Sequence, residues 1–184
     1  MHGRLLIISA PSGTGKTSVI QKLLARQKAL IHSVSWTTRS KRAQEIDGKD
    51  YHFKDEAFFK KGVEEGIFAE WAHVHDCYYG TPKAVLDNWL KEGKNVLLDL
   101  DVQGAMNLKR LYGAKAVTVF LLPPSEGELE RRLSERKTDS LEQRKIRLEN
   151  AKKEMTFKEK YDYQVVNENL DQACLEIEKI LQMS

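Results

Sequence analysis

The segment Ala10-Pro-Ser-Gly-Thr-Gly-Lys-Thr17 constrains this chain more than any other feature of its sequence. It directly follows the apolar run Leu5–Ile8 and precedes a helix-like stretch from Ser18 to Arg26. A strand, a glycine-rich turn and a helix start are the context in which a P-loop binds phosphate. The small residues let successive backbone N–H groups point at phosphate oxygens, and the helix N-terminus adds partial positive charge. The segment therefore predicts a triphosphate site at the end of a buried strand.

The last two residues of the segment carry the chemistry of a P-loop. Lys16 can reach the β- and γ-phosphates, and the Thr17 hydroxyl can ligate Mg²⁺. The pattern G-x-x-x-x-G-K-[ST] normally opens with glycine, and Ala10 stands at that position. A methyl group is tolerated there if φ is negative. The alternative interpretation is a glycine-rich turn between a core strand and a core helix, which needs no ligand.

Apolar strands alternate with amphipathic helices along most of the chain, which predicts an α/β fold with a parallel sheet flanked by helices. The expected strands are Leu5–Ser9, Asn95–Asp99, Ala116–Leu122 and Tyr163–Asn167. Two expected helices end near Arg26 and Arg110. Three more are expected over Ser125–Arg136, from Ser140 to about Lys158, and over Asp171–Leu181. Ser125 with Glu128, and Ser140 with Gln143, have the spacing of capping boxes, which indicates where two of these helices begin.

Two segments break this alternation. Residues 33–82 are rich in β-formers and aromatic side chains, and they predict a small inserted sheet with one helix at about Glu56–Glu65. In residues 126–160, 20 of the 35 residues are charged, so most of these side chains cannot be buried without pairing. That segment is either a pair of solvated helices or a mobile lid that lays arginines on a phosphate site. The P-loop favours the lid.

Length and composition narrow the class of partner. With 184 residues, one domain with insertions is expected. A net charge of +3 gives no global field that would attract nucleic acid, and no apolar run approaches the ~20 residues that span a bilayer. We therefore expect neither a nucleic-acid nor a membrane partner. The sequence does not choose between a monomer and a homo-oligomer.

The N-terminal segment lacks the layout of a signal peptide, and the two cysteines, Cys77 and Cys174, are typical of a reduced cytosolic protein. A cytoplasmic location is therefore expected. His73 and His75 could hold a metal on one side of a strand. Because no cysteine or third histidine lies nearby in the sequence, ordinary packing or solvent exposure is the better interpretation.

Basic residues gather where phosphoryl transfer would need them. Charge builds on a transferring phosphoryl group and must be met by Lys, Arg and Mg²⁺, and the planar arginine fork matches phosphate oxygens. The chain offers Arg39 and Arg42 in the inserted segment, and Arg131, Arg132, Arg136, Arg144 and Arg147 in the charged segment. Asp99 ends a buried strand, where a carboxylate that holds Mg²⁺ through water would lie. Asp101 lies near the same strand end, where α/β sheets bind ligands.

The chain resembles the guanylate kinase family in motifs that follow one another along nearly its whole length. Ser33-Val-Ser-Trp-Thr-Thr-Arg39-Ser-Lys-Arg42 resembles the family signature S-x-S-x-T-T-R-x-x-R. Further matching segments are Glu45–Phe53, Phe68–Ala72, Tyr78–Pro82, Leu98–Gly104, Leu122–Ser125, Arg136–Ser140 and Val166-Asn167. Such an ordered set is far more specific than the P-loop alone.

The resemblance implies the Mg²⁺-dependent reaction ATP + GMP ⇌ ADP + GDP, a step of purine nucleotide metabolism, with dGMP as a further expected acceptor. It also implies an organisation in three parts. A P-loop NTPase-type core would comprise residues 1–32, 83–125 and 161–184. Residues 33–82 would form a small α+β GMP-binding insertion, and residues 126–160 a helical lid over ATP.

The resemblance further implies roles for single residues. The GMP phosphate would be held by Arg39, Arg42, Tyr51 and Tyr79. Guanine would be read by Ser35, Glu70 and Thr81, with Asp101 as an additional candidate. The transferring phosphoryl group would be neutralised by Lys16, Arg42, Arg136 and Arg147, with Arg132 assisting. ATP would contact Ala10, Pro11, Ser12, Gly13, Thr14, Gly15, Lys16, Thr17 and Ser18, with Asn167 near the adenine. Mg²⁺ would be held by Thr17 and, through water, by Asp99.

The chemistry of guanine agrees with these roles. Its N1–H and exocyclic N2 amine are donors that one carboxylate, such as that of Glu70, can accept together. Its O6 accepts from hydroxyls such as those of Ser35 and Thr81. Adenine presents a different pattern, would leave buried groups unpaired and would be rejected. One departure from the family pattern concerns the GMP side, because Asp76-Cys77 stands where the family usually has Gly-Asn. If that position needs φ > 0, Asp76 is strained by ~1 kcal/mol, and its charge bears on GMP affinity.

Three other functions are compatible with parts of this pattern. A related P-loop kinase could act on another phosphorylated acceptor, such as a ribose bisphosphate, but would not need Ser35, Glu70 and Thr81 together. A guanylate-kinase-like binding module would catalyse nothing, and Lys16-Thr17 with the lid arginines argues against it. A P-loop switch protein is the third alternative, but an arginine-rich lid suits phosphoryl transfer better than signalling.

Overall fold

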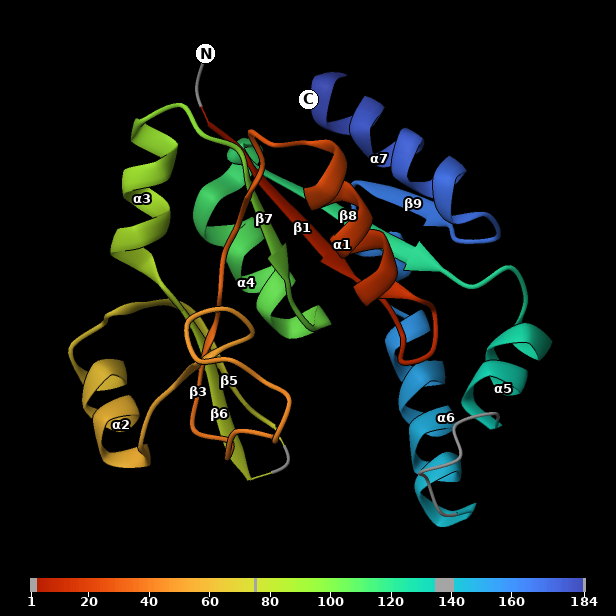
Figure 1. Cartoon of the computed structure of the whole chain (residues 1–184), viewed down its shortest axis with the longest axis horizontal. Coiled ribbons are helices and arrows are strands. Elements are labelled where there is room, and N and C mark those ends of the chain that lie inside the picture. Colours follow the sequence, from red (N-terminus) through yellow and green to blue (C-terminus); the bar gives the residue numbers. More distant parts are fainter. Residues whose placement is uncertain (1–2, 75, 135–140, 184) are drawn as a thin grey trace. The chain divides into compact units, whose positions relative to one another are not determined.

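A computed structural model of the chain describes residues 3–74, 76–134 and 141–183 (Figure 1). The strands are β1 Leu5–Ser9, β2 Ile31–His32, β3 Trp36–Thr37, β4 His52–Phe53, β5 Phe68–Val74, β6 Cys77–Pro82, β7 Val96–Asp99, β8 Ala116–Leu122 and β9 Tyr163–Val166. The helices are α1 Lys16–Arg26, α2 Glu56–Glu64, α3 Lys83–Lys91, α4 Val102–Tyr112, α5 Glu126–Ser134, α6 Leu141–Met155 and α7 Leu170–Met183. No helix in these ranges is both long and apolar enough to cross a bilayer.

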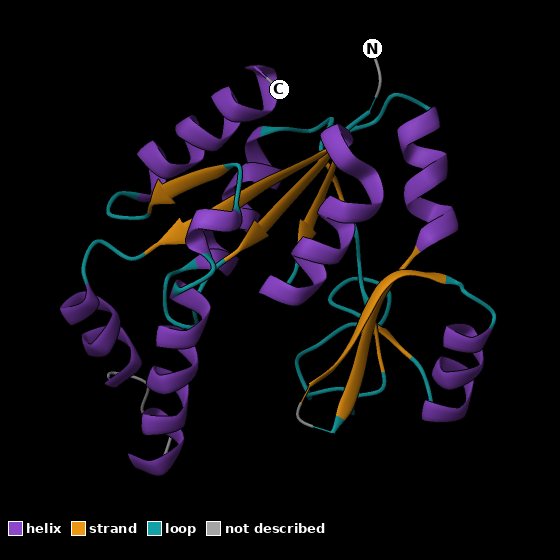
Figure 2. Cartoon of the chain, turned by 180° about the vertical axis from the view of Figure 1, so that it is seen from behind, coloured by secondary structure: helices purple, strands orange, loops and turns teal. Residues whose placement is uncertain are grey.

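The strands form a larger and a smaller sheet (Figure 2). The larger one has the order β2-β7-β1-β8-β9, and its pairs β2–β7 and β8–β9 are parallel. The smaller one has the order β4-β3-β6-β5 and is mixed, because β3 and β4 are parallel whereas β3–β6 and β5–β6 are antiparallel. A parallel sheet flanked by helices, with a small α+β insertion, confirms the predicted fold class.

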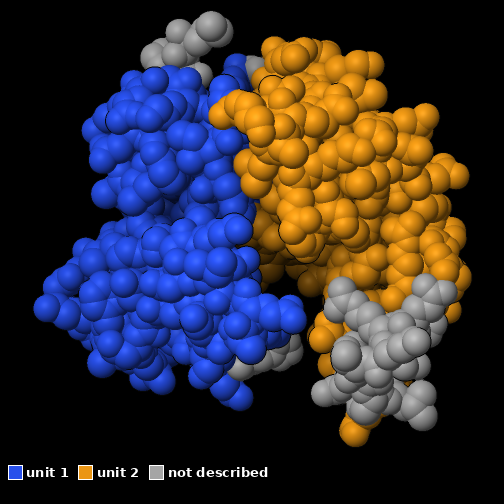
Figure 3. Space-filling view, viewed as in Figure 1, with its two compact units in different colours: residues 1–5, 29–98, 103–116 blue, residues 6–28, 99–102, 117–184 orange. Residues whose placement is uncertain are grey.

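The chain divides into two compact units (Figure 3). Unit 1 consists of Met1–Leu5, Ala29–Leu98 and Gln103–Ala116, and unit 2 of Leu6–Lys28, Asp99–Val102 and Val117–Ser184. The three-part organisation into core, insertion and lid stays a prediction.

Unit 2 is built around continuous apolar strands and two packed helices. All five residues of β1 are buried, as expected of a strand in a parallel sheet covered on both faces, and all but Leu5 belong to unit 2. Helix α1 buries Val19, Ile20 and Leu23 at helical spacing and packs on α7. Arg26 Nε and Nη2 donate to the Glu178 carboxylate at 2.7 and 3.0 Å across this helix pair. This packing fixes the helix that begins at the P-loop.

Helices α5 and α6 share a small apolar cluster of Leu129, Leu133 and Ala151, against which Leu148 packs. The Ser125 Oγ accepts from the backbone N–H of Glu128 at 3.1 Å, which confirms Ser125 as the predicted helix cap. The Glu128 carboxylate binds arginines of its own helix, as described below. The predicted helix start at Ser140 lies outside the described residues, and α6 is described from Leu141.

Unit 1 carries the small sheet, with α2 at the position predicted for its helix. Phe59 of α2 stacks on Phe68 of β5 with ring centroids 4.3 Å apart. A Cβ on Gly80 would lie 2.8 Å from both rings, so only glycine allows this close approach of strand and helix. Helix α3, for which the sequence interpretation made no prediction, buries Leu86 and Leu90 one turn apart.

The β5–β6 hairpin contains the residue at which the chain departs from the guanylate kinase pattern. Val74 pairs with Cys77, so Asp76 lies in the turn. Asp76 has φ = 62° and is the one non-glycine residue with positive φ among those described. The position does favour glycine, and aspartate is one of the few other residues that adopts this conformation at modest cost.

Candidate active site

The P-loop connects β1 to α1 and turns at two glycines. Gly13 and Gly15 have φ values of 92° and 93°, a region that L-residues with a side chain rarely adopt. Gly15 is the N-cap of α1, so the helix N-terminus opens directly onto the loop. Ala10 does not have positive φ, which explains why alanine is accepted at the first position of the motif.

Side chains from distant parts of unit 2 hold the loop at the carbonyl of Thr14. This oxygen accepts from Asn167 Nδ2 at 2.7 Å and from Arg132 Nη1 at 3.3 Å. The backbone N–H of Thr14 donates to the carbonyl of Pro11 at 3.2 Å, closing the turn. Thr14 is fully buried. The shape of the loop therefore depends on residues more than a hundred positions away in the sequence.

Lys16 and the two residues expected to hold Mg²⁺ lie at the end of the loop. The Lys16 ammonium forms an ion pair with the Asp99 carboxylate at the end of β7. Thr17 is exposed in the first turn of α1. A hydroxyl and a carboxylate are hard oxygen donors of the kind Mg²⁺ takes alongside nucleotide phosphates, so these residues fit that ion.

The arginines of the charged segment divide into those at the loop and those at the surface. Arg132 reaches Thr14, as described, and Arg147 Nη1 donates to Ser12 Oγ at 3.4 Å. Arg131 is exposed and pairs with Glu128 at 2.7 Å. Hydrogen bonds from Arg131 and then Arg132 lower the pKa of Glu128 to about 2. Arg136, predicted to act in transfer, lies outside the described residues.

Glu154 is a loop residue that sequence reasoning missed. It lies in the last turn of α6, and its carboxylate accepts a hydrogen bond from the backbone N–H of Ser12, near Lys16 and Asp101. Burial raises the pKa of this carboxyl group, Lys16 opposes that shift, and Asp101 adds to it. A glutamate at a helix C-terminus is disfavoured by the helix dipole, and that signal could have marked Glu154 for attention.

Unit 1 brings together the residues expected to hold the GMP phosphate. Arg39 Nη2 donates to Glu45 Oε1 at 2.7 Å, and its guanidinium lies 5.4 Å from the centroid of the Tyr51 ring. Tyr51 and Tyr79 meet edge to face with centroids 6.0 Å apart. The other Glu45 oxygen accepts from the backbone N–H of Arg42 at 2.8 Å. Glu45 therefore holds the side chain of Arg39 and the backbone at Arg42, a role that its place in the matching motif did not reveal.

Two of the residues expected to read guanine are already paired. Glu70 on β5 and Thr81 on β6 are register partners, and Thr81 Oγ1 donates to Glu70 Oε1 at 2.5 Å. Both are buried. Ser35 is half-buried just before β3, and its carbonyl accepts from the backbone N–H of His52 at 2.9 Å. Asp101 belongs to unit 2, and its expected contact with guanine stays a prediction.

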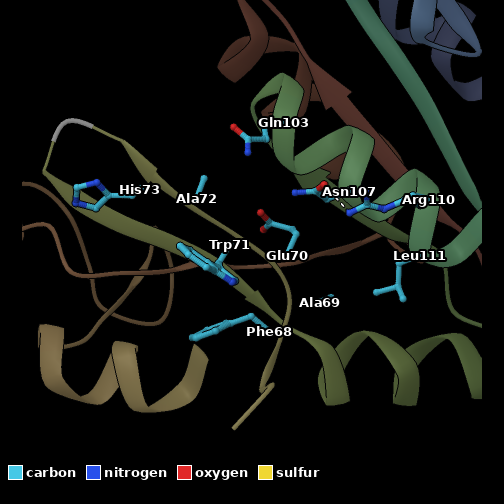
Figure 4. A pocket seen from close by; sticks show the side chains of 10 residues that line it. All are labelled: Phe68, Ala69, Glu70, Trp71, Ala72, His73, Gln103, Asn107, Arg110 and Leu111. Atoms are coloured by element: carbon cyan, nitrogen blue, oxygen red, sulfur yellow. Dashed lines mark hydrogen bonds between the residues drawn. The ribbon is translucent and has the colours of Figure 1, made fainter. Parts of the chain in front are cut away.

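Glu70 lines a pocket of about 750 Å³ within unit 1. One wall is β5, and the other is α4, which contributes Gln103, Asn107 and Arg110 (Figure 4). The Glu70 carboxylate extends from β5 toward the α4 side, and Arg110 Nη2 donates to Asn107 Oδ1 at 3.2 Å. No sequence motif marks these α4 residues as pocket lining, because pocket lining depends on which elements pack together.

A parallel α/β sheet, a P-loop with its lysine, and arginines at that loop define a P-loop phosphotransferase. The family model described as "Guanylate kinase" matches residues 2–184, and the chain belongs to the guanylate kinase family. This confirms the resemblance found in the sequence motifs.

Individual relatives agree with the family assignment. Guanylate kinase of Thermotoga maritima is 47% identical over 94% of this chain and 83% of its own length. That of Wolbachia sp. subsp. Brugia malayi is 45% identical over 98% of this chain and 92% of its own. The crystal structure of guanylate kinase from Anaplasma phagocytophilum superposes with a TM-score of 0.82 at 34% identity, covering 99% of this chain and 86% of that one.

Proposed function

We propose that this chain transfers the γ-phosphoryl group of ATP to GMP, and also to dGMP, giving ADP and the nucleoside diphosphate. The observation that carries the choice of acceptor is the buried Glu70–Thr81 pair beside the pocket of unit 1. The two carboxylate oxygens of Glu70 and the hydroxyl of its cross-strand partner Thr81 match the donors and the acceptor on the edge of guanine.

The Glu70 carboxylate accepts from guanine N1–H and from its N2 amine, and the Thr81 and Ser35 hydroxyls can donate to O6. Thr81 already donates to Glu70 and can turn its hydroxyl toward a ligand, because hydroxyl hydrogens rotate. Adenine would place an unprotonated N1 against the carboxylate and an amine against the hydroxyls. Because the Glu70 carboxylate is buried, facing adenine leaves it without the two donors that guanine supplies, and AMP is rejected.

The GMP phosphate binds at the cluster of Arg39, Arg42, Tyr51 and Tyr79. Arg39 is held by Glu45 and by the face of Tyr51, so its fork is fixed before the phosphate arrives. A phosphate dianion is itself a sufficient nucleophile, so the acceptor needs no general base.

On the ATP side, the P-loop amides and Lys16 hold the β- and γ-phosphates. Thr17 would hold Mg²⁺, with Asp99 acting through water, and when bound this ion neutralises charge on the phosphates. A phosphate oxygen of GMP forms a bond to the γ-phosphorus while the bond from that atom to the β,γ-bridging oxygen breaks, and ADP leaves. Arg42, Arg136 and Arg147, assisted by Arg132, neutralise the charge that develops.

A coupled assay of ADP release tests this proposal with GMP, dGMP, AMP, UMP and CMP as acceptors. We expect rapid, Mg²⁺-dependent turnover with GMP, turnover with dGMP, and little with the other three. Preference for another phosphorylated acceptor would contradict the guanine assignment, and absence of turnover with every acceptor would favour a binding module. The cytoplasmic location stays a prediction from the sequence.

A further inference from the structure

Asn167 is fixed on both its backbone and its side chain. It comes directly after β9, and its backbone N–H donates to the carbonyl of Leu122 at the end of β8 at 2.8 Å. Its side chain is buried, and Nδ2 donates to the Thr14 carbonyl at 2.7 Å. The family resemblance places Asn167 near adenine, but here its amide nitrogen is directed at the backbone of the P-loop.

The orientation of one peptide follows from this hydrogen bond. In a trans peptide the C=O and the N–H point in opposite directions. Because Asn167 holds the Thr14 carbonyl on its own side, the N–H of Gly15 points to the other side of the peptide. The loop binds phosphate through N–H groups that face its interior, so the direction of this peptide matters for binding.

The fit between Asn167 and the loop is also steric. A Cβ on Gly15 would lie 2.7 Å from Asn167 Nδ2, closer than any real contact of a Cβ atom. Glycine is therefore required at position 15 both by its φ of 93° and by the asparagine packed against it. Arg132 donates to the same carbonyl at the longer distance of 3.3 Å and gives secondary support.

We propose that Asn167 is a positioning residue of the P-loop, which orients the Thr14–Gly15 peptide so that the Gly15 N–H faces bound phosphate. The proposal rests on the proposed function only in that the loop binds a nucleoside triphosphate. Two roles are conceivable for Asn167, which are contact with the base of ATP and support of the loop that holds the phosphates of ATP. The proposal assigns the second role.

Inorganic tripolyphosphate distinguishes these roles, because it has the phosphates of ATP but no base. Calorimetric titration of the full chain compares tripolyphosphate with ATP for wild type, Asn167→Leu and Asn167→Ala. Leucine keeps most of the volume and removes the donor, and alanine serves if the leucine variant does not fold. We expect both ligands to bind about tenfold more weakly, since a buried carbonyl loses its best donor. In a separate steady-state assay, the KM for GMP should stay unchanged.

Asn169→Ala is the matched control. Asn169 Oδ1 accepts from the backbone N–H groups of Asp171 and Gln172 at 2.9 and 3.1 Å and caps α7. This variant should lower the melting temperature and leave the affinity for tripolyphosphate as in wild type.

Unchanged binding of tripolyphosphate by both Asn167 variants would overturn the proposal, and weakened binding of ATP alone would assign Asn167 to the base. The titrations contain no GMP. A wild-type chain that binds both ligands but does not phosphorylate GMP would therefore refute the proposed function and leave the test of Asn167 intact.

Discussion

The two units present their binding groups in different ways. In unit 2 the groups proposed to bind phosphate are backbone N–H groups of a loop, and the side chains of Asn167 and Arg132 donate hydrogen bonds to the Thr14 carbonyl of that loop. In unit 1 the groups proposed to bind GMP are side chains, and two of them are held by other side chains, in the Arg39–Glu45 and Glu70–Thr81 pairs.

This difference determines which substitutions each unit tolerates. A backbone site depends on conformation, so Ala10 is accepted where φ is not positive, whereas Gly15 has no room for a Cβ. A side-chain site depends on chemical identity, so the replacement of a carboxylate by an amide changes what it recognises. Substitutions in unit 2 should therefore affect any acceptor equally, and substitutions in unit 1 should affect GMP selectively.

The largest effect is expected for Lys16→Ala. It removes the charge proposed to reach the transferring phosphoryl group, so kcat should fall by about a thousandfold with any acceptor. The melting temperature should change little, because the ion pair with Asp99 is partly exposed. Lys22→Ala is the control, since Lys22 lies on the same helix and pairs with Asp171 at 2.6 Å. Turnover near wild type in Lys16→Ala would refute the P-loop assignment.

The second-largest effect is expected on the GMP side, for Glu70→Gln. Glu70→Gln cannot accept from both guanine donors, and loss of charge-assisted hydrogen bonds costs ~1.5–3 kcal/mol. The kcat/KM for GMP should fall about ten- to a hundredfold, the preference over AMP should narrow, and the KM for ATP should stay unchanged. Glu56→Gln, an exposed partner of Lys60 on α2, controls for the loss of a carboxylate. An unchanged ratio of GMP to AMP would mean that guanine is read elsewhere.

A smaller effect is expected for Glu45→Gln, which weakens the hold on Arg39 and Arg42. The KM for GMP should rise about fivefold without change in the KM for ATP, as steady-state kinetics with each substrate varied would measure. Hydrogen bonds from Arg39 and then from the Arg42 backbone lower the pKa of Glu45.

A lowered pKa means that this carboxylate stabilises the folded state above the ordinary carboxyl pKa, and that the contribution is lost as pH falls through the lowered value. The difference in melting temperature between wild type and Glu45→Gln should therefore shrink as the solution is acidified. A difference that grows toward acid pH would contradict the ion pair with Arg39.

The smallest effect concerns the hairpin turn. Asp76→Gly should stabilise the chain by up to ~1 kcal/mol because φ there is 62°, and Asp76→Ala should destabilise it. Thermal unfolding measures both changes.

Asp76→Asn keeps a residue that tolerates this conformation and removes the charge. The KM for GMP should change less than about twofold, because exposed charges are screened. A larger drop in KM would show that Asp76 repels the GMP phosphate.

Much of the fold could be predicted because local signals were strong. The buried run of β1, the glycines of the loop and the helix from Lys16 to Arg26 are adjacent in sequence, and the structure has them at the predicted positions. The Ser125 cap was readable for the same reason. By contrast, β2 has only two residues, Ile31 and His32, which is too short for a periodic pattern, so its pairing with β7 could not be predicted.

The supports of the site were less predictable than its binding groups. Motifs name the residues that touch ligand, but Asn167 reaches Thr14 across 153 positions, and the Glu154 carboxylate reaches the Ser12 amide from another helix. Such contacts arise from packing, which no local pattern encodes. Gln103 and Asn107 lie along the pocket for the same reason.

The most direct test of the account follows a labelled phosphoryl group. The chain is incubated with GMP, Mg²⁺ and ATP that carries an isotopic label in its γ-phosphoryl group, and the products are separated. We expect the label to appear in the β-phosphoryl group of GDP, with one ADP formed for each GDP. Label found only in inorganic phosphate would show hydrolysis without transfer and would contradict a guanine-reading acceptor site in unit 1.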